Sequence, residues 1–285
     1  MGVRILTGDC RTVLATLPDE SVHCVVTSPP YFGLRDYGVE GQIGLEDTPA
    51  AFVAEMVAVF RDVRRVLRRD GTLWLNLGDT YGKDKQLLMI PARVALAMKE
   101  CGWICRSEII WNKPNAMPTS VKDRPTTSHE YVYMFAKSSR YYYDAASVRV
   151  PFTESSLSRA KYARKARERD RGGRTDGFTT PAAAVPISNG GRNIRTVWTI
   201  PPEPFRGAHF AVFPSALVEP CVKAGCPIGG IVLDPFGGAG TTGLVANRLG
   251  RQAILIELNP DYAEIARSRL ARDGGMFAAF SGEAA

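Results

Sequence analysis

Residues 230–242 read GIVLDPFGGAGTT, and this stretch decides the fold. It starts with an apolar run, continues through a glycine-rich turn and leads into the helix-like residues 244–249. A strand, a glycine turn and a helix N-terminus in this order expose backbone N–H groups, which bind anionic ligands. The stretch therefore predicts a strand–turn–helix unit that holds a cofactor.

A second informative segment lies near the start of the chain. Residues 22–26 (VHCVV) form a nearly unbroken apolar run, which is typical of a parallel strand covered on both faces. Residues 27–31 (TSPPY) follow directly. Two successive prolines supply carbonyl groups without N–H donors, and Tyr31 adds a flat aromatic ring beside them. We expect a reactive site at the end of this strand.

Strand-like and helix-like segments alternate along the rest of the chain. This order predicts an α/β fold with a doubly wound, mostly parallel sheet. The expected strands are 3–7, 22–26, 72–77, 104–111, 130–135, 230–233 and 253–258. The expected helices are 10–17, 52–67, 90–101, 209–222 and 262–270.

The glycine turn and the TSPPY segment together resemble the cofactor and catalytic motifs of the amino-methylating DNA methyltransferases. Their order, catalytic motif first, resembles the circularly permuted β class of that family. The resemblance implies the fold of methyltransferases that use S-adenosyl-L-methionine (SAM). It further implies that the opening residues 4–9 supply the strand that follows the chain's last helix in the unpermuted fold and so fill the one gap that the C-terminal half leaves. Four regions are expected: a catalytic part (1–143), an inserted basic target-recognition region (144–196), a SAM-binding part (197–273) and a flexible tail (274–285).

The cofactor motif has the pattern Gly238-x-Gly240-x-x-Gly243, with Glu257 17 residues beyond Gly240. This pattern alone would also suit a dinucleotide, because glycines permit close approach and an acidic residue accepts hydrogen bonds from ribose. The DPF sequence before the turn and the TSPPY segment favour SAM. The resemblance implies cofactor contacts for Asp9, Thr27, His209, Phe210, Asp234, Phe236, Gly238, Gly240, Thr241, Thr242 and Glu257. For His209 a half-buried structural role is an open alternative.

The catalytic residues implied by the resemblance are Ser28, Pro29, Pro30 and Tyr31. An exocyclic amino nitrogen is a poor nucleophile because its lone pair is delocalised into the base. The Ser28 hydroxyl and the Pro29 carbonyl can accept its two protons and orient the lone pair toward the SAM methyl group. Tyr31 can stack on a base flipped out of the duplex. Residues 111–114 (WNKP) and 128–131 (SHEY) resemble later family motifs around the target base.

The net charge of +7 is concentrated in one segment. Residues 159–174 carry eight basic and two acidic side chains. Such a stretch suits a polyanion such as duplex DNA, although a solvated charged loop would have the same composition. The DNA-binding residues expected are Arg159, Lys161, Arg164, Lys165, Arg167 and Arg169.

The remaining composition narrows the class of protein. The six cysteines form no C-x-x-C pair and the three histidines are scattered, so we expect no metal site. There is no signal peptide and no apolar stretch long enough for a membrane span, so a cytoplasmic protein is expected. A cognate restriction endonuclease is a possible partner, and the chain is a possible homodimer.

The resemblance implies a site-specific methyltransferase that transfers a methyl group from SAM to N4 of a flipped-out cytosine in duplex DNA. Ser at the first catalytic position is typical of cytosine-N4 enzymes, whereas Asp or Asn is usual in adenine-N6 enzymes. The alternatives are an adenine-N6 DNA methyltransferase, an RNA or protein-amide methyltransferase, and an inactive DNA-binding relic.

Overall fold

The computed structural model describes residues 2–155, 157–158, 190–203, 213–274 and 280–281. Its strands are β1 (Val3–Thr7), β2 (Val22–Thr27), β3 (Leu67–Leu77), β4 (Ile104–Asn112), β5 (His129–Ala136), β6 (Val197–Thr199), β7 (Ile231–Asp234), β8 (Gln252–Glu257) and β9 (Phe280–Ser281). Its helices are α1 (Cys10–Thr16), α2 (Pro49–Val66), α3 (Ile90–Glu100), α5 (Ser215–Gly225), α6 (Thr241–Arg248) and α7 (Pro260–Gly274). No helix in these ranges has the length and apolar character that a membrane span needs.

The chain separates into two compact units, one of residues 1–144 with 196–285 and one of residues 145–195. The larger unit contains all the strands named above. In the described part of the smaller unit, Val150 and Arg192 form an antiparallel bridge, with the Arg192 N–H 2.9 Å from the Val150 carbonyl. A target-recognition role for this unit stays a prediction.

The strands form one sheet in the order β6-β4-β5-β3-β2-β7-β8-β1-β9. Among the described strands, β5 alone runs antiparallel to its neighbours. The mostly parallel α/β sheet expected from the sequence is confirmed. Parallel strands share one carboxyl edge, so the segments that follow β1, β2, β7 and β8 meet there.

The opening strand lies where the resemblance places it. β1 pairs in parallel with β8, and Thr7 lies opposite Glu257. The N-terminal residues thus complete the sheet beside the C-terminal strand–turn–helix unit. The permuted class itself stays a prediction.

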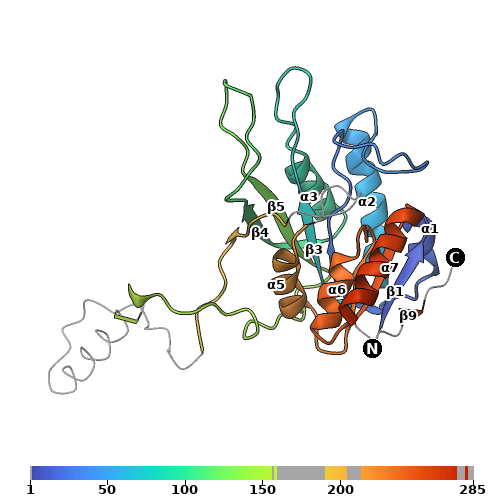
Figure 1. Cartoon of the computed structure of the whole chain (residues 1–285), viewed down its shortest axis with the longest axis vertical. Helices are drawn as coiled ribbons and strands as arrows, with labels where there is room; N and C mark the ends of the chain where they lie inside the picture. Colours follow the sequence, from blue (N-terminus) through green and yellow to red (C-terminus); the bar gives the residue numbers. More distant parts are fainter. Residues whose placement is uncertain (1, 156, 159–189, 204–212, 275–279, 282–285) are drawn as a thin grey trace. The chain divides into compact units, whose positions relative to one another are not determined.

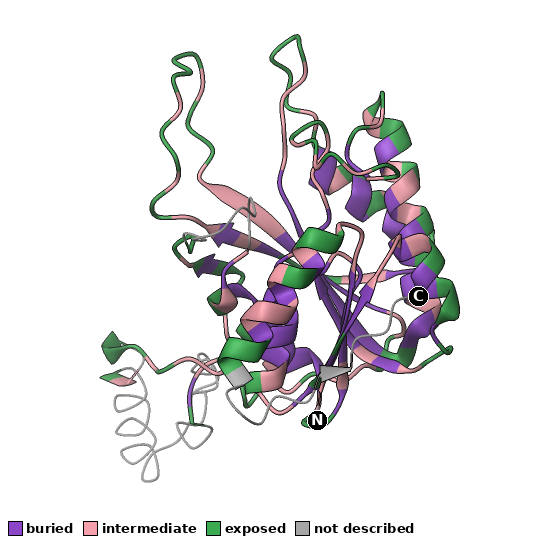
Figure 2. Ribbon diagram, turned by 45° about the vertical axis from the view of Figure 1, so that its right-hand side comes forward, coloured by how far each residue is buried: buried purple, intermediate pink, exposed green. Residues whose placement is uncertain are grey.

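Helices cover both faces of the sheet (Figure 1). On one face α1, α2 and α3 pack over a core that includes Phe52, Phe60 and Phe135. On the other face α5 contacts β2 and β3, and α6 and α7 continue the layer. The strands are buried in the middle, while the outward faces of the helices are exposed (Figure 2). Burying a side chain of this size stabilises the fold by about 1.5–3 kcal/mol.

The glycine turn needs its glycines for two different physical reasons. Gly240 precedes α6 with φ of +81°, a conformation that favours glycine, and a Cβ there would lie 2.9 Å from the Ala266 Cβ of α7. A Cβ on Gly243 would lie 2.9 Å from Leu255 Cδ1 and Val3 Cγ1. Gly240 therefore fixes the turn, and Gly243 lets α6 lie close to the sheet.

One sequence-based expectation is wrong in detail, and one stays a prediction. The helix expected over 209–222 is α5, which begins at Ser215 and ends at Gly225. The residue before a proline disfavours the helical conformation, so a helix does not run through Phe213 into Pro214. Pro214 is extended, with φ of −70° and ψ of 147°, and immediately precedes α5. The flexible tail at 274–285 stays a prediction; within it, Phe280 and Ser281 form β9 and pair with Val3 and Arg4.

Candidate active site

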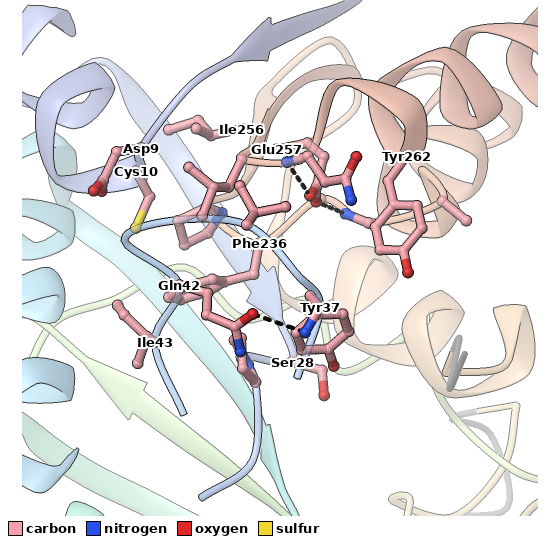
Figure 3. Close-up of a pocket in the computed structure, with 18 of the residues that line it drawn as sticks. Asp9, Cys10, Ser28, Tyr37, Gln42, Ile43, Phe236, Ile256, Glu257 and Tyr262 are labelled. Carbon is pink, nitrogen blue, oxygen red and sulfur yellow. Dashed lines mark hydrogen bonds between the residues drawn. The ribbon is translucent and has the colours of Figure 1, made fainter. Parts of the chain in front are cut away.

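A pocket opens at the carboxyl edge of the sheet, where β1, β2, β7 and β8 end (Figure 3). The turns after these four strands supply most of its lining. Residues predicted from the sequence that line it are Asp9, Ser28, Pro30, Phe236, Gly238, Thr241 and Glu257. Residues not predicted that also line it include Cys10, Tyr37, Gln42, Ile43, Phe213, Ile256 and Tyr262.

Glu257 faces this pocket from the end of β8. One carboxylate oxygen accepts a hydrogen bond from the Gly238 N–H at 2.7 Å and the other from the Asn259 N–H at 2.9 Å. Burial raises the pKa of this carboxyl, against the lowering effect of both backbone donors. Each oxygen keeps acceptor capacity, so the side chain can bind hydroxyl groups of a ligand.

Asp234 lies behind the pocket wall and braces the turn. It is fully buried and accepts hydrogen bonds from the hydroxyls of Thr27 at 2.6 Å and Thr242 at 2.7 Å. The Phe236 N–H donates a third at 3.0 Å. Burial raises the pKa of Asp234 to about 6. The side chains of Thr27, Asp234 and Thr242 therefore hydrogen-bond to one another inside the protein. Of the adjacent Thr241 and Thr242, Thr241 is the one that lines the pocket.

Asp9 lies at the N-terminus of α1, where it accepts the Arg11 N–H at 2.9 Å. The Arg11 guanidinium also binds both carboxylate oxygens. Burial alone would raise the pKa of Asp9, but the hydrogen bonds and charge of Arg11 hold it below its usual value. Asp9 thus borders the pocket as a charged group whose position is fixed.

The segment after TSPPY forms a wall of the pocket that sequence reasoning missed. The Tyr37 N–H donates to the Gln42 side chain at 2.7 Å, and the Tyr37 ring meets Tyr262 edge-on, with centroids 6.3 Å apart. The segment has neither strand nor helix periodicity, so its residues gave no signal beyond their nearness to Ser28.

A polar cluster of Ser28, Tyr31, Asn76, Lys113 and Glu130 adjoins the pocket at Ser28. The Tyr31 hydroxyl donates to Glu130 Oε2 at 2.6 Å and lies 3.3 Å from Ser28 Oγ. The Asn76 amide donates to Tyr31 at 2.7 Å, to Glu130 at 2.9 Å and to Ser28 at 3.2 Å. Lys113 forms an ion pair with the other Glu130 oxygen.

Sheet register explains how these residues meet. Glu130 lies opposite Trp111 in the β4–β5 pair, and Trp111 comes two residues before Lys113. Asn76 lies opposite Val132 in the β3–β5 pair, so Asn76 and Glu130 share a face. The predicted WNKP and SHEY segments therefore supply Lys113 and Glu130, whereas Asn76 carried no motif.

Several predicted site residues lie outside the described residues. These are His209, Phe210, Arg159, Lys161, Arg164, Lys165, Arg167 and Arg169. Pro29, Tyr31 and Gly240 are described but do not line the pocket.

Comparison with known proteins gives the family. The DNA methylase family of N6 and N4 methyltransferases matches residues 22–268. This chain belongs to that DNA methylase family. Membership confirms the resemblance drawn from the motifs and makes SAM the cofactor.

Two Type II methyltransferases match this DNA methylase over most of their own length. It is 43% identical to the Type II methyltransferase M.Cfr9I of Citrobacter freundii, over 94% of this chain and 88% of that protein. It is 41% identical to M.SmaI of Serratia marcescens, over 94% of this chain and 91% of that protein.

Solved structures agree with the fold. A candidate DNA modification methylase from Thermus thermophilus, solved in complex with SAM, is 30% identical with a TM-score of 0.66 and covers 98% of this chain and 99% of its own. The cytosine-N4-specific PvuII DNA methyltransferase is 22% identical with a TM-score of 0.69, over 94% of this chain and 86% of its own, and it supports the fold alone.

Proposed function

We propose that this DNA methylase is a Type II, site-specific enzyme that methylates N4 of a flipped-out cytosine in duplex DNA. The observation that carries the proposal is the position of Ser28. Its side chain belongs to the polar cluster, and the residue also lines the pocket that Glu257 and Phe236 border. The Ser28 hydroxyl, which can bind the amino group of a base, thus adjoins the pocket proposed for the methyl donor.

The pocket residues fit SAM by their chemistry. Glu257 would bind the ribose hydroxyls, and the apolar side chains of Phe236, Ile43 and Ile256 would surround the adenine. Gly238 and Thr241 would contact the methionine part. A Cβ on Gly237 would approach Leu255 Cβ to 3.0 Å, so the backbone of this turn stays close to β8. When bound, SAM supplies an electrophilic methyl group on a positively charged sulfur.

Ser28 is proposed to orient the base. Its hydroxyl oxygen and the Pro29 carbonyl accept the two amino protons, which turns the nitrogen lone pair toward the donor. Because Ser28 is neutral and shorter than Asp or Asn, it favours cytosine N4 over adenine N6. The residues 144–196 and the basic side chains at 159–169 are proposed to hold duplex DNA, with a cognate endonuclease and a second copy of the chain as further proposed partners.

Mass spectrometry of nucleosides tests the proposal directly. DNA from cells that express the protein should contain N4-methylcytosine, and methylation-sensitive sequencing should locate it at one site. Ser28→Ala should reduce methyl transfer by about 10²-fold while SAM affinity by calorimetry stays within about twofold, because the contact forms only with the base. N6-methyladenine without N4-methylcytosine would make adenine the target and remove the selective role of Ser28.

A further inference from the structure

In the polar cluster described above, the structure defines which group donates and which accepts in each hydrogen bond. Glu130 is paired with the Lys113 ammonium and carries no proton of its own to donate. The Tyr31 hydroxyl must therefore give its single proton to Glu130, at 2.6 Å. Ser28 is then the donor in the remaining contact with Tyr31, at 3.3 Å.

The orientation of the Asn76 amide follows from the same argument. With its oxygen turned toward Glu130, two acceptors would face each other across 2.9 Å, so the NH₂ group faces the carboxylate. The Asn76 oxygen is then buried and has no partner among the described residues. Leaving an acceptor unpaired costs about 1–3 kcal/mol. Such a cost is typical of functional sites, where geometry is held against local preference.

Packing fixes the Tyr31 ring in addition to its hydrogen bonds. A Cβ on Gly78 would lie 2.4 Å from Tyr31 Cε2, so the ring fits against that glycine. Burial, followed by the charge of Glu130, raises the pKa of Tyr31 well above its usual value. The phenol therefore stays protonated and remains a donor to Glu130 across the working pH range.

We infer that Ser28, Tyr31 and Glu130 form a proton relay that removes the surplus proton from the amino group once it has been methylated. This inference rests on the proposed function. The hydrogen-bond chain runs from Ser28 through Tyr31 to Glu130 and leaves one Ser28 lone pair for the substrate, since Asn76 occupies the other.

The proton balance of the relay is simple. The methylated amino nitrogen is cationic, and its N–H bond breaks as a proton passes to Ser28 Oγ. The Ser28 proton moves to the Tyr31 oxygen, and the Tyr31 proton moves to Glu130, which becomes a neutral acid. Lys113 keeps its three protons. Because the Glu130 side chain is 15% exposed and that of Lys113 21%, water can take the proton from Glu130.

In this role Tyr31 and Glu130 are positioning residues, because they reach the substrate only through Ser28. The test uses the full chain, saturating SAM and a DNA duplex that carries the site found by sequencing. Glu130→Gln should lower the single-turnover rate by about 10²-fold or more, the range for lost acid–base catalysis. Tyr31→Phe, which keeps the Glu130–Lys113 pair, should lower it similarly. The double variant should lose no more than the slower single variant.

A matched control comes from the opposite edge of the sheet. Glu20 also pairs with a lysine, Lys137, at 3.0 Å, and it lies before β2 rather than after it. Glu20→Gln should leave the single-turnover rate within about twofold of the wild type, since it removes a carboxylate of an exposed ion pair that is worth about 1 kcal/mol or less. Calorimetry with SAM should give the same affinity for all variants.

The pH dependence separates a relay from a merely structural role. Among the described residues, the groups that face Glu130 are Lys113, Tyr31 and Asn76. If the relay operates, the wild-type rate should depend on pH and Glu130→Gln should abolish that part of the dependence, whereas loss of a merely structural contact should leave the pH profile unchanged.

The outcomes distinguish the relay from the proposed function. An active wild type with Glu130→Gln and Tyr31→Phe equal to Glu20→Gln would refute the relay alone. Additive losses with an unchanged pH profile would also refute it and leave only packing. A wild type that transfers no methyl group to any DNA would remove the proposed function, and the relay with it.

Discussion

Asp234 shows how a single buried residue can hold the turns of the site together. Its carboxylate is fully buried yet collects three hydrogen bonds, from Thr27, Thr242 and the Phe236 N–H. These bonds tie the end of β2 to the glycine turn after β7. The family resemblance implies cofactor contacts for Asp234, Thr27 and Thr242, and such a resemblance does not specify which side chains turn into the protein. Which of two adjacent threonines faces the pocket depends on the helix start, and the sequence does not specify that rotation.

The raised pKa of Asp234 leads to a prediction about stability and pH. Burial raises it from 3.8 to about 6 in the folded protein, so the folded state binds more protons than the unfolded state between these values. The contribution of Asp234 to the free energy of unfolding is therefore greatest below pH 3.8 and falls as pH rises to about 6. At about 1.4 kcal/mol per pKa unit, the loss is on the order of 3 kcal/mol.

Denaturant titrations of the wild type and Asp234→Asn at several pH values measure this effect. In the variant, the free energy of unfolding should no longer change with pH through Asp234. The difference in free energy of unfolding between the two proteins should therefore change mainly between pH 3.8 and about 6. Glu257 titrates in both proteins, and because the charge of Asp234 helps to raise the pKa of Glu257, the difference also contains a coupled contribution from Glu257. A difference that is constant from about pH 4 to about pH 7 would mean that Asp234 titrates normally.

Among the elements, the strand–turn–helix unit of β7 and α6 was the most predictable from sequence. The pattern of Gly240 and Gly243 is local, and its physical reasons are local too: a left-handed turn and two close approaches. The start of α5 was less predictable, because Pro214 opposes a helix whereas Pro220 lies inside the same helix and is tolerated. The polar cluster was partly hidden, since Asn76 meets Glu130 only through the register of β3 and β5.

The close approach at Gly240 predicts a specific effect of substitution. Gly240→Ala must bear both the positive φ of 81° and a Cβ 2.9 Å from the Ala266 Cβ, so α6 and α7 must move apart. We expect a loss of about 2–5 kcal/mol in the free energy of unfolding and weaker SAM binding, since left-handed backbone costs about 1–2 kcal/mol and overpacking about 1–3. Denaturant titration and calorimetry with SAM measure both.

Gly250→Ala is the matched control for that change. Gly250 has a similar φ of 73°, but its added Cβ would meet only Ile228 Cγ2, at 3.8 Å. It should therefore lose only the conformational part, about 1–2 kcal/mol, and keep its SAM affinity. Equal losses in the two variants would show that contact with α7 does not matter.

At the scale of the whole molecule, DNA binding depends on where the proposed site lies in the sheet and on where the basic residues lie in the chain. The pocket and the polar cluster lie at the carboxyl edge of the sheet, where Ser28 follows β2. The basic run at 159–174 lies between β5 and β6 in sequence. The chain leaves β5 at Ala136, opposite Thr72 at the other edge of the sheet, and enters β6 at Val197, opposite Ile110. The sequence specificity of the basic run could not be predicted, because base recognition depends on individual side chains rather than on net charge.

The salt dependence of DNA binding tests whether this basic run holds the duplex. Replacing Arg164, Lys165, Arg167 and Arg169 with Gln removes four positive charges from the run. Each lost phosphate contact lowers the slope of log affinity against log salt by about 0.9, so the slope should fall by about 3.6 if all four contact phosphates. A control with the same change of charge replaces Arg68, Arg69, Lys99 and Arg140, which are exposed at the opposite edge of the sheet. Its slope should stay within about 1 of the wild type, because a change in net charge without contacts releases few counterions. Equal slopes for the two variants would show that the basic run acts only through net charge and that other residues bind the duplex.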